Sequence, residues 1–449
     1  GRPRQSRTSP VRHALALAGL FMLGACGRSE TDAASDRAAN AANPAGLSPG
    51  KGGLSAVIAQ GSFSAVSADE SRAAEVGRDI LQAGGNATDA AVAMYFAMAV
   101  TLPSAAGLGA SGACIVHDDK TKKAESFVFP PVAAGSINGQ PIAVPSGVRS
   151  LTLMHVRHGS LRWEQVVAPA ERLARFGVPV SRALARDMQA GGAMLAGDRE
   201  ARRVFGGGAL SEGATLTQPE LAGTLAAIRQ RGGVEFFQGP LARTMSEQVA
   251  QMGGSLPLEA MRAAVPLAGE PMTEGYGRRR VYTAPAPAAG AAALAGWKGQ
   301  QPGGATPTDS QGFSGFAVVD AKAGAAACTL SMGRLFGSGA MVPAVGVLLG
   351  SPTPDAGSVS PVIVASPNNG EFTFVGAGGG APTAAQATGY VAYATVEREQ
   401  PLANVLTAQR GQGGWVNAIV CPAGLRADPT KCRTAIDPAG LGLSMIATR

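Results

Sequence analysis

Cysteine and histidine are the residues best suited to metal binding and thiol chemistry, and this chain contains five and four of them. His155 and His158 fall near the end of one predicted helix, without a carboxylate or cysteine motif beside them. Structural zinc sites draw mostly on four Cys or His ligands at short, regular spacings. The sequence therefore predicts a surface role for these two histidines, and we expect neither a bound metal nor a cofactor.

The cysteines suggest three different kinds of chemistry. Cys114 and Cys328 lie in apolar, strand-like runs and are most simply interpreted as buried thiols. Cys421 and Cys432 flank a loop with proline and charged residues. In an oxidising compartment they could close a small disulfide loop that stabilises the fold by roughly 2–3 kcal/mol. The sequence leaves open whether their Cα atoms come close enough. Cys26 ends an apolar N-terminal run.

The predicted secondary structure that must position any site differs between the first and the second half of the chain. Helical spacing of apolar residues predicts helices in the first half and one later, and a long stretch rich in Gly, Pro and Ala follows the early helices. The predicted helices cover 71–83, 86–102, 147–158, 163–175, 218–231, 239–252 and 383–397, and the Gly/Pro/Ala-rich stretch covers 253–312.

Short strands dominate after residue 313. The expected strands are 113–116 in the first half and then 316–320, 326–331, 345–349, 361–365 and 371–376. Two of them, 316–320 and 326–331, are separated only by Ala321–Gly324 and are predicted to pair as adjacent central strands. Helices first and strands later, without βαβ alternation, indicate an α+β fold.

Seven short motifs resemble those of the γ-glutamyltransferase family and occur in the family's order between residues 68 and 380. The most specific is Gly84–Ala93, which is close to a "GGNAxDAAVA" signature. The others are Val144–Gly147, Ala168–Ala174 with Gly177, Gln218–Ala222, Phe236–Ala242, Phe336–Gly339 and Gly376–Gly380.

The resemblance implies a four-layer αββα sandwich of the N-terminal-nucleophile (Ntn) hydrolase type. In that family the precursor cleaves itself, and the new N-terminal Thr attacks a γ-glutamyl amide such as glutathione. Its own α-amine serves as the base, which is why the nucleophile must be an N-terminus. Backbone N–H groups of two adjacent glycines stabilise the oxyanion.

Carried over residue by residue, the resemblance leaves part of this machinery in place. Gly379 and Gly380 match the oxyanion glycines, although three glycines in a row also serve as tight turns. Ser331 matches a supporting Thr and keeps its hydroxyl, and Ser358 and Ser360 match a substrate-binding loop.

The reacting groups themselves are missing. Counting back from Asp320 places Phe313 at the nucleophile position, and a phenyl ring cannot attack an acyl carbon. The arginine that would grip a substrate carboxylate is replaced by Val128, which cannot make its charge-assisted hydrogen bonds. Gly333 replaces a family Asn, and the stretch before Phe313 is shorter than usual, as though helices were missing from it.

Ser314 is the remaining candidate nucleophile. Cleavage before it would expose an N-terminal serine, but a shift of one residue along a strand turns the side chain to the opposite face. A bulge at Gly312 or Gly315 could compensate. Since Phe313 offers no nucleophile, we expect the 312–314 peptide bonds to stay intact and γ-glutamyl transfer to be negligible.

The N-terminus resembles a bacterial lipoprotein signal. Four arginines precede the apolar run Ala14–Leu23, which is too short to span a bilayer as a helix and ends in Leu23–Cys26. We predict a signal peptide at 1–25, lipid attachment at Cys26 and a flexible tether at 26–55. An ordinary secretory signal with a chance cysteine is the alternative.

The remaining chain is predicted to comprise a large-subunit-like region, 56–312, and a small-subunit-like region, 313–449. Removing the four signal arginines leaves 34 basic against 31 acidic residues. This small net positive charge does not indicate nucleic-acid binding. The expected location is the bacterial cell envelope, lipid-anchored and facing the periplasm. Two hypotheses remain: an amidohydrolase for γ-glutamyl or related peptide amides, or a catalytically inactive family member that acts as a binding domain.

Overall fold

Two antiparallel sheets stack face to face in the computed structural model, which describes residues 63–305, 307–410 and 412–448. The first sheet has seven strands, in the order β19 (Leu443–Ile446), β1 (Ala65–Ala68), β11 (Phe313–Val319), β12 (Ala325–Ser331), β2 (Ser111–His117), β3 (Ala124–Phe129) and β8 (Leu267–Gly269). The second has six, in the order β18 (Arg433–Ile436), β17 (Trp415–Val420), β16 (Phe372–Gly379), β15 (Val362–Ala365), β10 (Arg279–Thr283) and β9 (Met272–Tyr276).

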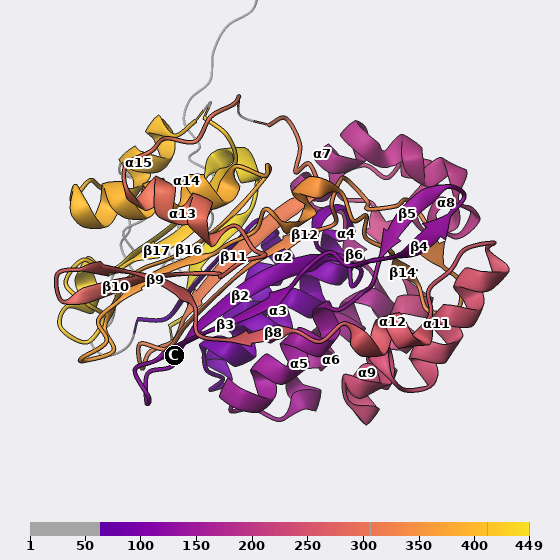
Figure 1. Cartoon of the computed structure of the whole chain (residues 1–449), viewed down its shortest axis with the longest axis horizontal. Helices are drawn as coiled ribbons and strands as arrows, with labels where there is room; N and C mark the ends of the chain where they lie inside the picture. Colours follow the sequence, from indigo (N-terminus) through magenta and orange to yellow (C-terminus); the bar gives the residue numbers. More distant parts are fainter. Residues whose placement is uncertain (1–62, 306, 411, 449) are drawn as a thin grey trace, which may run out of the picture. The chain divides into compact units, whose positions relative to one another are not determined.

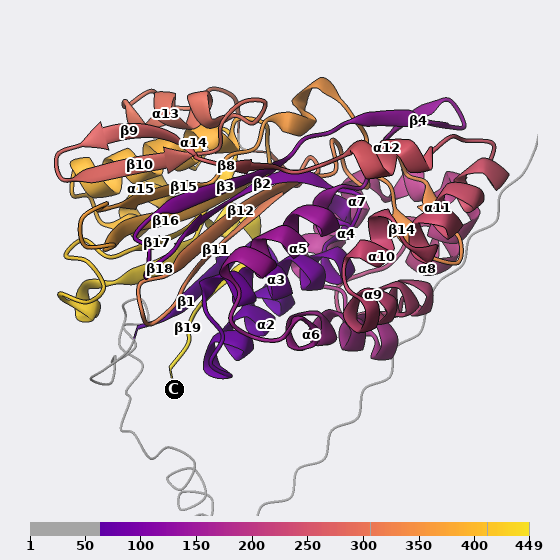
Figure 2. The same cartoon turned by 60° about the horizontal axis from the view of Figure 1, so that its bottom comes forward.

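Helices cover the outer face of each sheet (Figures 1 and 2). The first sheet carries α2 (Ser71–Gln82), α3 (Ala87–Thr101) and α5 (Gly147–His158), and α6 (Trp163–Phe176) packs on α3. The second carries α13 (Gly290–Trp297), α14 (Ala384–Ala392) and α15 (Leu402–Ala408). The order of layers is therefore helix, sheet, sheet, helix, and the predicted αββα sandwich is confirmed.

The remaining elements extend the helical side. They are α4 (Pro103–Ala106), α7 (Arg182–Gly191), α8 (Arg199–Phe205), α9 (Pro219–Arg231), α10 (Val234–Phe237), α11 (Pro240–Gln251) and α12 (Leu258–Ala263). Three two-stranded ribbons join them: β4 (Ala133–Ile137) with β5 (Gln140–Ala143), β6 (Val178–Pro179) with β7 (Thr215–Leu216), and β13 (Met341–Val342) with β14 (Val347–Leu348).

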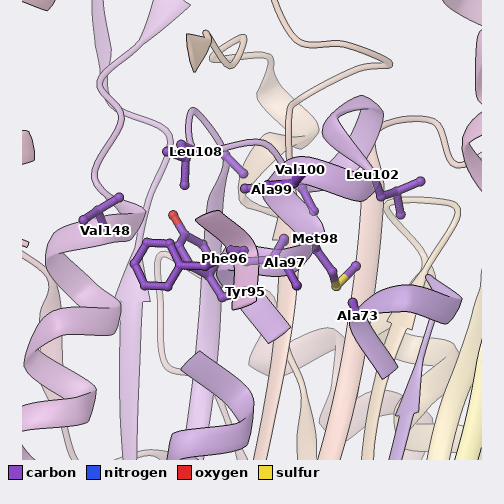
Figure 3. Close-up of a cluster of buried hydrophobic side chains, with 14 of the residues drawn as sticks. Ala73, Tyr95, Phe96, Ala97, Met98, Ala99, Val100, Leu102, Leu108 and Val148 are labelled. Carbon is purple, nitrogen blue, oxygen red and sulfur yellow. The ribbon is translucent and has the colours of Figure 1, made fainter. Parts of the chain in front are cut away.

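Helix α3 is buried along its whole length. Asn86 and Asp89 form a capping box at its start, each side chain accepting a hydrogen bond from the other's backbone N–H. Its apolar side chains, including Tyr95 and Met98, pack between β11 and β12 on one side and α2 and α6 on the other (Figure 3). The near-continuous apolar run of α3 follows from this burial on every side.

Residues from both halves of the chain surround the start of β11. Each sheet contains strands from before and from after residue 313, so the two predicted subunit-like regions contribute to the same sheets. The predicted pairing of 316–320 with 326–331 is confirmed, because β11 and β12 are antiparallel neighbours near the middle of the first sheet.

Other expectations from the sequence agree with the structure only in part or are not tested by it. Segment 345–349 supplies only the short β14, which pairs outside the main sheets. The 253–312 stretch contains α12, β8, β9, β10 and α13, so a helix does precede Phe313. The helical stretch predicted at 383–397 is confirmed, and it is a regular α-helix to Ala392 that continues to Glu397 as a π-helical turn. The signal peptide, the tether and Cys26 lie outside the described residues.

Candidate functional site

Phe313 opens β11 directly opposite Ser331 of β12. Opposed residues of an antiparallel pair project to the same face, so the predicted nucleophile position and the predicted supporting hydroxyl are neighbours. The Phe313 ring is buried, with 2% of its surface exposed. A phenyl side chain therefore fills the place where an attacking group would lie.

The ring belongs to a small apolar cluster that contains other substituted positions. Its buried members are Ala113, Val128, Ala284, Phe313 and Val359. Val128 stands where the family's carboxylate-gripping arginine is expected, and Val359 lies within the predicted substrate loop. The structure thus brings these predicted positions together in one packed apolar cluster.

Two of the predicted site serines, Ser331 and Ser360, form hydrogen bonds with backbone groups through their hydroxyls. The Ser331 hydroxyl accepts a hydrogen bond from the N–H of Gly333 at 2.9 Å. The Ser360 hydroxyl accepts from the N–H of Ala284 and donates to the carbonyl of Pro361, both at 3.0 Å. Ser358 is half-buried, and its N–H donates to the carbonyl of Asp355.

The glycine pair lies beside the start of β11. The N–H of Gly380 donates to the carbonyl oxygen of Phe313 at 3.1 Å. A Cβ on Gly379 would lie 2.3 Å from the Asp69 carboxylate, and one on Gly380 would lie 2.6 Å from the Trp415 ring. Both positions need glycine because the β11 backbone, the Asp69 carboxylate and the Trp415 indole leave no room for a side chain there.

Ser314 faces away from this glycine pair. Along β11, Ala317 and Val319 pack between the two sheets, whereas Phe316 and Val318 pack against the helices. Side chains alternate along a strand, and the β11–β12 register is unbroken, so Ser314 shares the helix-facing side. Its hydroxyl is buried and has no hydrogen-bond partner among the described residues.

A buried carboxylate next to the glycine pair was missed by the sequence analysis. Asp69 accepts hydrogen bonds from the N–H of Gly315 at 2.9 Å and from the side-chain amide of Asn417 at 2.8 Å. Burial raises the pKa of Asp69 to about 6, although these hydrogen bonds and the nearby Arg186 act in the opposite direction. The sequence gives no sign of a site at Asp69 other than its position between a strand and the N-cap residue of α2.

A second buried carboxylate fixes the segment that leads into β11. Asp187 accepts hydrogen bonds from the Ser104 hydroxyl and from both the N–H and the hydroxyl of Ser310. Arg186 pairs with the same carboxylate at 3.0 Å. The approach to Phe313 is therefore held by an internal polar network rather than by an exposed loop.

Both pairs of described cysteines form disulfides. Cys421 and Cys432 are bonded, with their Cα atoms 4.2 Å apart. Cys114 and Cys328, expected as buried thiols, are also bonded to each other. That expectation was wrong because the two residues face each other directly on the neighbouring strands β2 and β12, a pairing that the sequence alone does not reveal.

The surface role predicted for the two histidines was also wrong. His155 is buried beside Asp89, and the His158 ring lies 2.6 Å from the Glu125 carboxylate. Asp89 and Glu125 lie outside the helix that carries the two histidines, so no local sequence motif predicts these contacts. In the part of the chain that the structure describes, no group of three or more Cys, His, Asp or Glu is arranged to hold a metal ion. Nor is any described helix long and apolar enough to cross a membrane.

The fold places the protein in a structural class. The structure superposes on the cephalosporin acylase from Bacillus halodurans with a TM-score of 0.69, covering 90% of this chain and 98% of that one. The two sequences are 19% identical, so the similarity establishes a shared Ntn-hydrolase-type fold alone.

The family follows from the sequence. The profile of the gamma-glutamyltranspeptidase family matches residues 73–299, and the chain belongs to that family. It is 32% identical over 240 residues to the "Glutathione hydrolase proenzyme" of Bacillus subtilis (strain 168), covering 49% of this chain and 41% of that protein. It is 31% identical over 247 residues to the protein of the same name from Escherichia coli (strain K12), covering 50% and 42%. The aligned region thus spans less than half of each relative's length.

Proposed function

We propose that this protein is a catalytically inactive member of the gamma-glutamyltranspeptidase family that acts as a binding domain. The observation that carries the proposal is the environment of Phe313. Its ring is buried opposite Ser331, and its carbonyl oxygen already accepts the Gly380 N–H. Covalent catalysis of this type needs an N-terminal hydroxyl or thiol with its own amine as the base, and Phe313 supplies no such nucleophile.

The surroundings of Phe313 support the same conclusion. Val128 cannot bind a substrate carboxylate through paired hydrogen bonds as an arginine does. The Phe313 cluster is apolar and buried, so a charged γ-glutamyl group placed among its side chains would lose hydration that those side chains cannot replace.

The test is turnover of γ-glutamyl-p-nitroanilide and of glutathione by purified protein, with Ser314→Ala as the matched variant. We expect both proteins to release product at the rate of the buffer control. Turnover in the wild type that Ser314→Ala abolishes would contradict the proposal.

A serine-type amidohydrolase acting on γ-glutamyl or related amides is the second candidate, and the Gly380 hydrogen bond specifically favours it. That N–H already polarises the carbonyl before Ser314. Attack by the Ser314 hydroxyl would form an ester to Phe313 and break the Phe313–Ser314 amide, with the hydroxyl proton passing to the freed α-amine. Hydrolysis of the ester would then release an N-terminal Ser314. Intact-mass analysis distinguishes the candidates, because only this second one produces a chain that begins at Ser314.

We further propose that the protein is a lipoprotein of the bacterial cell envelope, anchored through Cys26 and facing the periplasm. Two disulfides in the described part support an oxidising compartment, since such bonds are rare in the cytosol. Cys26→Ser should move the protein from the membrane fraction to the soluble fraction, whereas the neighbouring variant Ser29→Ala should not. An unchanged distribution of Cys26→Ser would remove the anchor assignment.

A further inference from the structure

A cavity of about 610 Å³ lies between α7 and the segment 208–212, with Leu441 closing one side. Its polar lining comes from Arg182, Arg186, Gln189, Ser211 and Glu212. None of the residues of the Phe313 cluster lines it. The cavity is therefore distinct from the Phe313 cluster, although Arg186 also belongs to the polar network that leads into β11.

Arg186 is held rigidly at the wall of this cavity. Its Nε donates to Asp187 at 3.0 Å, and its Nη1 donates to the carbonyls of Ala439 and Gly440 at 3.1 and 3.4 Å. Its guanidinium carbon lies 4.7 Å from the centre of the Trp415 ring. These contacts engage Nε and Nη1, whereas Nη2 has no hydrogen-bond partner among the described residues. A fixed guanidinium binds an anion with little loss of conformational freedom.

Arg182 lies one helical turn before Arg186 on the same face of α7. Like charges at this spacing, with Cβ atoms about 5–6 Å apart, destabilise a helix unless a counter-charge lies near them. Asp187 supplies a counter-charge to Arg186 at 3.0 Å, but Arg182 has none among the described residues. Arg182 is exposed and makes no ion pair in the described part of the chain, and Glu212 pairs with neither arginine there. The cavity thus presents two cationic groups and one acidic group.

We propose that this cavity binds a small dicarboxylate, with one carboxylate on Arg186 and the other on Arg182. Guanidinium groups bind carboxylates and phosphates through paired hydrogen bonds. The volume of about 610 Å³ exceeds what a lone phosphate needs, and Glu212 would repel a compact dianion placed between the arginines. The site goes beyond the proposed function and does not depend on whether the chain is cleaved.

Glutarate, butyrate and inorganic phosphate are suitable probes at low ionic strength. Glutarate and butyrate have similar aliphatic chains but differ by one carboxylate. Binding can be followed through tryptophan fluorescence, because Arg186 stacks on Trp415, and by calorimetry in the Trp415→Phe variant, which should lose most of the fluorescence change. We expect glutarate to bind about tenfold more tightly than butyrate, the contribution of one further carboxylate–guanidinium contact.

Arg182→Gln should bring the glutarate affinity to within about twofold of the butyrate affinity, because it removes the second contact. Since Arg182 is exposed, this variant should keep the melting temperature of the wild type. Arg199→Gln, which removes an equal charge from exposed surface on α8, is the matched control and should leave the preference intact. Equal affinities for glutarate and butyrate, or a preference that survives Arg182→Gln, would overturn the proposal. Tighter binding of phosphate than of glutarate, lost in Arg182→Gln, would overturn it in favour of a phosphate site. None of these outcomes changes whether Phe313 prevents catalysis.

Discussion

The backbone N–H of Gly380 donates a hydrogen bond to the carbonyl oxygen of Phe313 at 3.1 Å. The donor that would stabilise a substrate oxyanion thus binds the protein's own chain at the residue before Ser314. In an inactive member this contact simply anchors the start of β11 to the second sheet. In a serine-type enzyme it would polarise the bond to be cut. The chemistry at this junction therefore decides between the two functions.

The peptide bonds between residues 312 and 314 are predicted to remain intact. Phe313 has no nucleophilic group, and Ser314 projects toward the helices, away from Gly379 and Gly380. Intact-mass analysis of purified protein should give one chain for residues 56–449, whatever the processing before them.

The sample must be reduced before this measurement. The Cys114–Cys328 disulfide links the two sides of the junction, so a cleaved protein would still migrate as one band without reductant. A reduced fragment that begins at Ser314, and disappears in Ser314→Ala, would be incompatible with an intact junction.

Phe313→Thr should destabilise the fold by roughly 3–5 kcal/mol, because it leaves a cavity and buries a hydroxyl in an apolar cluster. Chemical denaturation followed by circular dichroism measures the change. Phe176→Thr is the matched control, since the Phe176 side chain is 76% exposed, and we expect a change within about 0.5 kcal/mol there. Equal stability of the two variants would mean that the Phe313 ring is not packed in the core.

The disulfide between the halves should stabilise the fold more than the local one. Cys114 and Cys328 are 214 residues apart, whereas Cys421 and Cys432 are separated by 11. In the chain-entropy account a longer loop restricts the unfolded state more. The variant with alanine at 114 and 328 should lose roughly 3–5 kcal/mol, against roughly 2–3 kcal/mol for alanine at 421 and 432. The reverse order, measured by denaturation, would show that native-state contacts outweigh loop closure.

Much of the framework could be predicted from local sequence patterns. The capping box at Asn86 and Asp89, the apolar run of α3 and the turn between β11 and β12 all depend on residues close together in the chain. The family motifs then ordered these elements into layers. For that reason the layer order and the central strand pair agree with the structure.

The rest depends on contacts between distant residues. The Cys114–Cys328 bond requires the exact register of β2 on β12, and His158 meets Glu125 across separate elements. Asp69 is distinguished only by burial among groups from β11, β16 and β17. No local spacing encodes such neighbours. Elements with few residues, such as β14, also lack a periodic pattern long enough to identify them.

His117 should make the protein less stable as the pH falls. Burial lowers the pKa of His117 from 6.5 to about 4, so below 6.5 the unfolded chain binds a proton that the fold does not. The loss between pH 6.5 and 4 amounts to roughly 3 kcal/mol. In His117→Phe this part of the pH dependence should disappear, which denaturation at pH 7 and pH 4.5 can measure. An unchanged difference between the two pH values would show that His117 becomes protonated in the folded state.

Asp69 should act in the opposite direction over nearly the same range. Its pKa is raised from 3.8 to about 6 because the carboxyl is buried, so between these values the folded protein holds a proton that the unfolded chain has released. Stability from this group therefore increases as the pH falls through 6, by roughly 3 kcal/mol down to pH 3.8.

Asp69→Asn removes the titration while keeping an acceptor for the Gly315 N–H. Compared with the wild type, this variant should lose stability more steeply between pH 7 and pH 4.5, because the destabilising His117 contribution is no longer offset. The exposed variant Asp79→Asn is the control and should follow the wild type. If Asp69→Asn also has the wild-type slope, the carboxyl is ionised in the fold at pH 4.5, and its polar neighbours compensate its burial.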